Sequence, residues 1–529
     1  MTRINTNVPS LISQRVLGQN NQALNTSLER LSTGLRINRG KDDPAGLIAS
    51  ENLRAEKVAI NAAIRNAERA DQVVNIAEGG LNEISSLLTE VQSLLTQTAN
   101  AAGLSDEELE ANQLQIDSIL QTIDRIAGST SFQGSKLLNG NLDYNISNVS
   151  GVVSKSSVNG AKLEFNGTQD VDVLDTASAQ LAGFILSLGG SLNLGGAGAT
   201  DGSDDQFVIE IAGSLGSREL SFASGATVSD IVSAINTFTN VTGVVAEASG
   251  TGLRLDSSEY GSSEFVSVKV VEDSALNTAV AQAGIYNLSA GNTEVLDGTT
   301  PAALFTATAA TNGLTDFGQD VEATINGIVA TTNGRTVRIN TDFLDVEVEL
   351  DYDTSNPSAA QLGLVNAFTI TGGGADFQLA PRVDIAGRVP IGIANVAARD
   401  LGVTDARVFD ASGNPTTERY SLADFGTGKE LNHVDGNLDA GQQVIDEAIR
   451  EVSSLRGRLG AFQANTVGAT IRSLGISLEN TAAAESLIRD TDFASETAGL
   501  TRAQILSQSA QTSLQLANTQ PQGVLQLLG

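Results

Sequence analysis

Residues 17–35 read LGQNNQALNTSLERLSTGL, and this stretch decides the fold. One leucine-rich set recurs within it at spacings of 4, 3, 4, 3 and 4 residues: Leu17, Asn21, Leu24, Leu28, Leu31 and Leu35. This spacing places the set on one stripe of a helix and is typical of a coiled-coil seam. Because a single helix cannot bury such a stripe, the stretch predicts a helix that needs a partner.

Two more helices are predicted downstream of this stretch. Asp43 can cap a helix whose first residue is Pro44, and that helix runs to about residue 100. Its apolar residues form two adjacent rows, which indicates burial against more than one neighbour: Ala77, Gly80, Ile84, Leu87, Val91 and Leu94 in one row, and Leu81, Leu88 and Leu95 in the other. Ser105 and Glu108 have the spacing of a capping box for a third helix, with Gly128 as its expected end.

The other end of the chain repeats the helical pattern. From residue 437 onward a 3-4 spacing predicts one continuous stripe: Ile445, Ala448, Val452, Leu455, Leu459, Phe462, Thr466 and Ala469. A final segment carries Ala503, Leu506, Ala510, Leu514 and Ala517, followed by Pro521 and an apolar end with Val524 and Leu525. In the simplest arrangement, the N-terminal helices pair with the C-terminal helices. Apolar stripes on the other helix faces then need other copies of the chain to cover them.

Between the helical ends the apolar period drops to two. Residues 207–211, 321–325 and 345–350 read as strands. Thr227 and Asp230 predict the start of one short helix among them. We therefore expect an α+β multidomain chain with a coiled-coil core from both termini and an inserted, surface-facing β-rich middle.

The expected domain boundaries follow from these patterns. They are an N-terminal inner-core helix in 1–43, a helical body with a β-hairpin in 44–170, inserted β-rich domains in 171–430, a C-terminal helix of the helical body in 431–485, and a C-terminal inner-core helix in 486–529. Residues 171–425 carry 32 acidic and 10 basic residues, a net charge of −22. Such an acidic middle repels nucleic acids and anionic membranes, so we expect neither as a partner.

No catalytic, cofactor-binding or metal-binding residues are predicted. The 529 residues include no cysteine, which excludes disulfides and thiolate sites, and their one histidine, His433, cannot form the H-E-x-x-H zinc motif. Asp201, Asp204 and Asp205 lack the spacing of an EF-hand loop, and Gly372-Gly373-Gly374 lacks the lysine of a phosphate loop.

Several motifs at both ends resemble those of bacterial flagellins. The N-terminal ones are Leu31-Ser32-Thr33-Gly34-Leu35-Arg36-Ile37-Asn38, Lys41-Asp42-Asp43-Pro44-Ala45-Gly46 and Phe132-Gln133-Gly134-Ser135-Lys136-Leu137-Leu138. The C-terminal ones are Ile488-Arg489-Asp490-Thr491-Asp492-Phe493-Ala494, Ala503-Gln504-Ile505-Leu506 and the ending from Ala517 to Leu525. Residues 207–271 resemble a small β-rich repeat inserted in many flagellins, with a weaker second copy in 320–350 or 320–400.

The resemblance implies an exported, non-enzymatic subunit that polymerises into the extracellular flagellar filament, with no cofactor. Its implied partners are other copies of itself, an export chaperone and export gate, hook-associated junction and cap proteins, and glycans. The implied polymerisation residues are Leu17, Leu24, Leu28, Leu31, Leu35, Leu506, Leu514, Val524 and Leu525. Two alternatives stay open: a hook–filament junction protein, and a surface adhesin or carbohydrate-binding enzyme with helical stalks.

Many flagellins also present a patch to an innate immune receptor. In this sequence Leu94 fits that pattern, whereas Glu90 stands at the position of its key arginine and Gln115 at that of its glutamate. The resemblance therefore implies a degenerate patch, and we expect weak receptor activation.

Overall fold

The computed structural model describes residues 6–100, 103–164, 167–188, 192, 206–250, 252–272, 283–289, 293–296, 301–351, 363–409, 415–432 and 436–528. The chain divides into two compact units. We call them the terminal unit (Met1–Asp71, Gln378–Gly387 and Gln463–Gly529) and the central unit (Gln72–Phe377 and Arg388–Phe462). In the described residues, no helix combines the length and apolarity that crossing a membrane requires.

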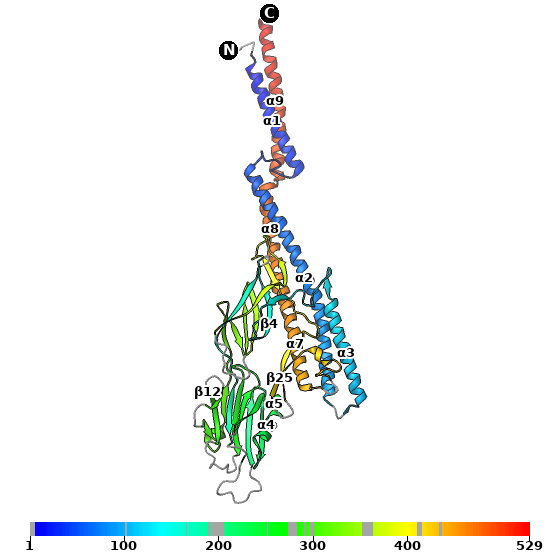
Figure 1. The fold of residues 1–529 in the computed structure, drawn as a ribbon. Coiled ribbons are helices and arrows are strands. Elements are labelled where there is room, and N and C mark those ends of the chain that lie inside the picture. Colours follow the sequence, from blue (N-terminus) through cyan, green and yellow to red (C-terminus); the bar gives the residue numbers. More distant parts are fainter. Residues whose placement is uncertain are drawn as a thin grey trace. The chain divides into compact units, whose positions relative to one another are not determined.

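Long helices form from both ends of the sequence (Figure 1). They are α1 Val8–Thr33, α2 Pro44–Thr98, α3 Asp106–Ser129, α7 Leu438–Ala461, α8 Gly468–Arg489 and α9 Phe493–Leu528. The predicted caps are confirmed: Asp43 Oδ1 accepts the N–H of Gly46 at 2.9 Å, and Ser105 and Glu108 form a reciprocal capping box. Gly128 does not end α3, whose C-cap is Thr130.

The stripe from Ile445 to Ala469 is not one continuous α-helix, as the sequence predicted. A π-helical turn, η3 Phe462–Val467, separates α7 from α8. In the central unit, Phe462 packs its ring 5.8 Å from that of Phe377, and a π-turn accommodates one extra residue in the helix. Periodicity alone does not reveal this turn, because the apolar spacing continues through it.

The helical part of the central unit joins the two ends of the sequence, as predicted. Most residues of both expected rows of α2 are buried in it, namely Ala77, Leu81, Ile84, Leu88, Val91, Leu94 and Leu95, while Gly80 and Leu87 are partly buried. Arg456 of α7 forms a 2.8 Å ion pair with Glu78 of α2. Gln113 of α3 donates its side-chain N–H to the carbonyl of Phe425, at the end of the short helix η2 Leu422–Phe425, at 2.7 Å.

A first β-domain comprises residues 144–177 and 321–376. One of its sheets has the order β17-β16-β5-β21-β3 and the other the order β18-β19-β20-β4. The strands are β3 Tyr144–Ser147, β4 Val153–Ala161, β5 Gln169–Ala177, β16 Glu322–Ile325, β17 Ile328–Val329, β18 Thr331–Asn333, β19 Thr336–Asn340, β20 Leu344–Leu350 and β21 Gly363–Gly373. Their inward residues, such as Val173, Val346 and Phe368, form one buried cluster. The domain thus has its own core.

A second β-domain, residues 182–317, is inserted into the first. Its sheets have the orders β13-β12-β6-β10-β9, with β14 beside β12, and β15-β11-β7-β8. The elements are β6 Gly183–Ser187, β7 Gln206–Gly213, β8 Ser217–Ala223, α4 Val228–Asn236, α5 Thr239–Thr242, β9 Val244–Ser249, β10 Gly252–Ser257, β11 Phe265–Glu272, β12 Gly284–Ser289, β13 Thr293–Leu296, β14 Ala303–Leu304, α6 Thr308–Asn312 and β15 Leu314–Phe317. Thr227 and Asp230 cap α4 reciprocally, as predicted. A buried cluster that includes Phe207 and Phe305 forms a separate core.

The two β-domains meet at a tightly built junction. An isolated bridge pairs Gln180 with Gln319, so the second domain is entered and left at one place. Asp320 accepts the N–H of Gly334 at 2.8 Å and the N–H of Ser262 at 3.0 Å, which links the two domains. At Gly318, an added Cβ would lie 2.4 Å from the carbonyl oxygen of Gly261, so the junction requires glycine there.

Strand pairings and helix contacts cross the domain boundaries expected at residues 171 and 430. β4, which precedes residue 171, pairs with β20, because its apolar face completes the core of the first β-domain. At the other limit, Leu422 and Phe425 are fully buried and belong to the segment that contacts α3 and α7. The remaining short strands form hairpins: β1 Ser131–Phe132 with β2 Ser135–Lys136, β22 Ala375–Gln378 with β23 Arg388–Ile391, and β24 Thr404–Phe409 with β25 Pro415–Tyr420.

Candidate assembly site: the terminal helix pair

The first helix of the terminal unit has clear local start and stop signals. The side-chain oxygen of Asn7 accepts the N–H of Ser10 at 3.2 Å, which caps the first turn of α1. At the other end Gly34 has a φ of +72° and donates its N–H to the carbonyl of Arg30 at 2.9 Å. A left-handed glycine of this kind ends a helix sharply, so α1 stops at Thr33.

Helices α1 and α9 lie side by side and antiparallel (Figure 1). Polar side chains fix their register along the whole length. Ser10 Oγ donates to Asn518 Oδ1 at 2.8 Å, Asn20 Nδ2 donates to the carbonyl of Leu506 at 3.1 Å, and Ser507 Oγ donates to Asn21 Oδ1 at 2.8 Å. The predicted pairing of the two chain ends is therefore present within one subunit.

Small residues fill the contact between these helices. The buried positions are Ser10 and Ser27 on α1, and Ala503, Ser507, Ala510 and Ala517 on α9. Those on α9 follow a 4-3 spacing that Leu514, which is half-buried, completes. The three alanines were predicted from the sequence, whereas the three serines were not. The serines follow the same heptad spacing, but a search for apolar periodicity does not include them because serine is polar.

Bulky apolar side chains of both helices are left exposed. Leu28 and Leu506, both predicted polymerisation residues, expose 48% and 46% of their surface. Leu11, Ile505 and Leu516 expose more than half of theirs. Leu17, Leu24, Leu31 and Leu35 are half-buried, while the side chains of Val524 and Leu525 lie outside those described. Of the predicted residues, Leu28 and Leu506 therefore lie outside the small-residue contact that joins α1 to α9. The half-buried Leu17, Leu24 and Leu31 follow the buried Ser10 at intervals of seven residues, and Leu514 lies within the spacing of the contact on α9.

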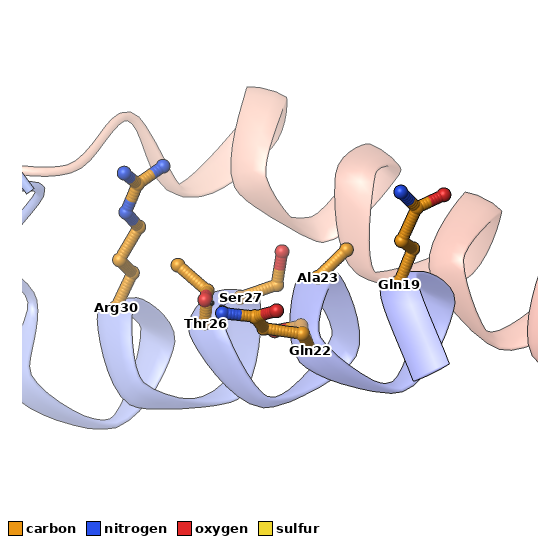
Figure 2. A pocket seen from close by; sticks show the side chains of 6 residues that line it. All are labelled: Gln19, Gln22, Ala23, Thr26, Ser27 and Arg30. Carbon is orange, nitrogen blue, oxygen red and sulfur yellow. Dashed lines mark hydrogen bonds between the residues drawn. The ribbon is translucent and has the colours of Figure 1, made fainter. Parts of the chain in front are cut away.

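A groove of about 440 Å³ runs along α1 beside α9 (Figure 2). It is lined by Gln19, Gln22, Ala23, Thr26, Ser27 and Arg30. Figure 2 shows Gln19 at one end and Arg30 at the other. Arg30 Nη1 lies 3.6 Å from Glu496 Oε2 of α9, and both side chains are partly exposed, so this ion pair adds little stability.

The loops that follow α1 and precede α9 are joined to each other. Leu35 and Asp490 form an antiparallel bridge, and the N–H of Arg36 donates to the carbonyl of Arg489 at 2.7 Å. The N–H of Thr491 donates to the carbonyl of Gly34 at 2.9 Å. The N-terminal and C-terminal sequence motifs, some 450 residues apart, therefore meet in one small structure.

An acidic side chain organises the next part of this loop. Asp42 Oδ2 accepts the N–H of Arg39 at 2.9 Å and that of Asn38 at 3.2 Å. The bond from Arg39 is the main reason that the pKa of Asp42 lies below its usual value. Ile37, next to this turn, is buried, which brings the loop onto the start of α2 through Gly46.

The residues of the predicted receptor patch differ in exposure. Glu90 on α2 and Gln115 on α3 are exposed, whereas Leu94 is 5% exposed and cannot present its side chain in this structure. His433 and the three aspartates at 201, 204 and 205 lie outside the described residues. Within the described part, no group of three histidine, cysteine or acidic side chains is arranged to hold a metal ion.

Comparisons with known proteins match both helical ends and the middle. Residues 4–143 match the bacterial flagellin N-terminal helical region, residues 442–528 match the bacterial flagellin C-terminal helical region, and residues 206–259 match the flagellin hook IN motif. Among solved structures, FliC from Burkholderia pseudomallei is 13% identical and covers 75% of this chain and 99% of that chain. Its TM-score is 0.25, too low to carry a structural argument.

Full-length relatives are similar over nearly all of both sequences. Flagellin from Salmonella muenchen is 29% identical over 557 residues, covering 99% of each chain. B-type flagellin from Pseudomonas aeruginosa is 30% identical over 549 residues, again covering 99% of each. These matches show that the chain belongs to the bacterial flagellin family, whose members are structural subunits of the extracellular flagellar filament.

Proposed function

We propose that this subunit polymerises through the bulky apolar side chains that α1 and α9 leave exposed. The observation that supports the proposal is that small and large side chains occupy different surfaces of these helices. Small residues make the contact within the subunit, while Leu28, Leu506 and their neighbours remain accessible. Exposed apolar surface of this kind gains free energy when another copy of the helix pair covers it.

The experiment compares two paired substitutions in the full-length protein. Leu28→Ser with Leu506→Ser removes two of the proposed contact residues. Leu215→Ser with Phe317→Ser removes two side chains that are each 65% exposed in the second β-domain. Seeded polymerisation is followed by light scattering and electron microscopy. We expect the first pair to raise the critical concentration by about tenfold or more.

The control pair should polymerise like the parent, since its residues lie outside the terminal helices. Equal critical concentrations for the parent and the Leu28→Ser/Leu506→Ser variant would refute the proposal. Hydrogen-exchange patterns of both monomers show whether either variant has lost its fold.

The same helix pair supports more specific proposals about partners. Association with other flagellar proteins follows from the family. We infer further that an export chaperone and export gate handle the unassembled ends, that hook-associated junction and cap proteins contact the same helices, and that glycans attach to exposed residues of the β-domains. Crosslinking from α9 during export would identify the first two classes of partner.

Flagellins are structural proteins, and we infer that this chain catalyses no reaction. Its proposed organisation is an inner core of the terminal helices, a helical body, and β-domains at the surface. The supporting observation is that the β-domains have separate cores while the terminal helices expose apolar residues. A gel of sheared filaments tests the structural role, because a filament subunit should dominate it and a junction protein should be scarce.

A further inference from the structure

An apolar row crosses the outward face of the first β-domain. Val329 on β17, Leu174 on β5 and Leu364 on β21 expose 81%, 39% and 70% of their surface. Leu174 is the direct partner of Leu364, and Thr324 of β16 is the direct partner of both Leu174 and Val329. Directly paired residues point to the same face of a sheet, so these side chains form one continuous row.

The row has a definite length. It spans three strand intervals, from β17 across β16 and β5 to β21. At a spacing of about 4.8 Å between strands, Leu174 lies roughly 10 Å and Leu364 roughly 14 Å from Val329. A helix rises about 1.5 Å per residue, so its positions i, i+7 and i+10, about 10.5 and 15 Å along the axis, match these separations. These three positions lie on one helix face.

Carboxylates border the row on both sides. On β5, Asp172 and Asp170 lie two and four residues before Leu174, so both lie on one side of the row. Glu322 of β16 lies two residues before Thr324, on the other side of the row. Asn366 and Thr369 of β21 donate to Asp172 and Asp170 at 3.0 and 2.7 Å, which confirms that both acids share the outward face. Among the described residues, no ion pair joins these three carboxylates to a basic side chain.

We propose that this row is a docking surface for a cationic amphipathic helix of another protein. The apolar stripe of the helix would cover Val329, Leu174 and Leu364, and basic side chains on both borders of the stripe would face Asp170, Asp172 and Glu322. Complementary charge selects such a partner. Repulsion between carboxylates disfavours the pairing of this face with the same face of a second copy.

The probe is a fluorescein-labelled synthetic helix of about 15 residues with leucines at i, i+7 and i+10 and lysines beside them. Binding to the full-length monomer is measured by fluorescence anisotropy. Val329→Ser with Leu364→Ser should weaken binding by about tenfold, since most of the apolar contact is lost. Asp170→Asn with Glu322→Gln should weaken it by a similar factor at low salt and reduce its salt dependence.

Matched controls separate this surface from general attraction, because the net charge of −31 draws any cationic peptide. Leu215→Ser with Val383→Ser removes exposed apolar residues elsewhere, and Glu219→Gln with Glu247→Gln removes exposed acids of the second β-domain. Both control variants should bind like the parent. A probe with the same composition in scrambled order, and one with glutamate in place of lysine, should bind at least about tenfold more weakly.

Three results would overturn the proposal: equal binding by row and control variants, equal binding of the scrambled probe, or failure of the row variants to form filaments. The last result would assign the row to contacts between subunits. Thermal unfolding by circular dichroism shows whether the row variants fold. If the double variant does not, Leu364→Thr, which suits a strand, replaces it and should weaken binding by about threefold.

Discussion

The terminal helices and the β-domains place their apolar residues in opposite ways. In the β-domains, large side chains such as Phe368 and Phe207 are buried in two separate cores. In α1 and α9, alanine and serine are buried, and leucines such as Leu28 and Leu506 expose nearly half of their surface. The β-domains therefore complete their cores within one chain, whereas we propose that the terminal helices do so only in an assembly.

This difference has a thermodynamic consequence. A contact of small residues buries little apolar area, and long helices without a large packed face are marginally stable in water. The monomer should then hold the β-domains firmly and the terminal helices weakly. If neighbouring subunits cover the exposed leucines, as we propose, assembly should stabilise the terminal helices.

The largest change to the molecule that we consider is the removal of one β-domain. Replacing residues 183–316 with a short Gly/Ser linker should leave filament assembly intact, because the bridge between Gln180 and Gln319 already holds the two cut ends together. The cost of closing such a loop changes slowly with length, about 0.6 kcal/mol per doubling. Electron microscopy of the truncated protein is the measurement.

A wider deletion is the matched comparison. Removing residues 171–425 would also remove Phe425, whose carbonyl accepts a hydrogen bond from Gln113, and would leave β4 without β20. We expect that protein to misfold. A folded 183–316 deletion that never polymerises would show that the second β-domain supplies essential subunit contacts.

Two alanine substitutions, one at a buried residue and one at an exposed residue, sharpen the comparison in the monomer. Phe368→Ala should lower the opening free energy of the first β-domain by roughly 3–5 kcal/mol, because Phe368 is fully buried. Leu28→Ala should change monomer stability by less than about 0.5 kcal/mol, since nearly half of that side chain is already exposed. Native-state hydrogen exchange in β5, β21 and α1 measures both. Equal losses from the two substitutions would contradict the account.

In the central unit, helices α2 and α3 carry the predicted receptor patch. Weak activation is expected because Glu90 presents an acid where the pattern has an arginine, a mismatch of roughly 2–5 kcal/mol if buried at the receptor. Glu90→Arg with Gln115→Glu should raise potency in a reporter-cell titration of the monomer. Full potency of the unmodified chain would refute this residue-level argument.

The smallest effect concerns a cap in the second β-domain. Thr227→Ala should cost about 1 kcal/mol in the opening free energy of α4, because Thr227 accepts the N–H of Asp230. The hydrogen bond from the Thr227 side chain is also the main cause of the lowered pKa of Asp230. The carboxylate thus stabilises the folded state above its unfolded pKa of 3.8, and this contribution is lost as the pH falls through the lower folded value.

Hydrogen exchange at several pH values therefore tests the cap in two ways. In the parent, protection of α4 should fall as the pH drops below about 4. In Thr227→Ala the same pH dependence should be smaller. Unchanged pH dependence in the variant would show that the Thr227 side chain does not lower the pKa of Asp230.

Local signals in the sequence were sufficient for much of the fold. Asp43 with Pro44, Ser105 with Glu108, and Thr227 with Asp230 each specify a helix start through neighbouring atoms, and each cap is present. Strands with alternating apolar residues, such as β20, were predicted for the same reason. The fold class follows from these elements and their order.

Features set by distant contacts could not be read in this way. β5 pairs with β21, almost 200 residues away, and this nesting of one β-domain in another leaves no periodic signal. The π-turn at Phe462 and the serines between α1 and α9 are likewise fixed by tertiary packing. At the candidate site, periodicity identified the leucines but could not say that Leu28 and Leu506 lie outside the contact within the subunit while Leu514 lies within its spacing.

The most direct test compares hydrogen exchange in the monomer and in the filament. The account predicts fast exchange in the monomer across residues 17–35 and across α9, slow exchange in the buried strands β5 and β20, and strong protection of both terminal helices after polymerisation. Strong protection across Leu17–Leu35 in the monomer would contradict the central claim, because the terminal helix pair would then be stable without a second subunit.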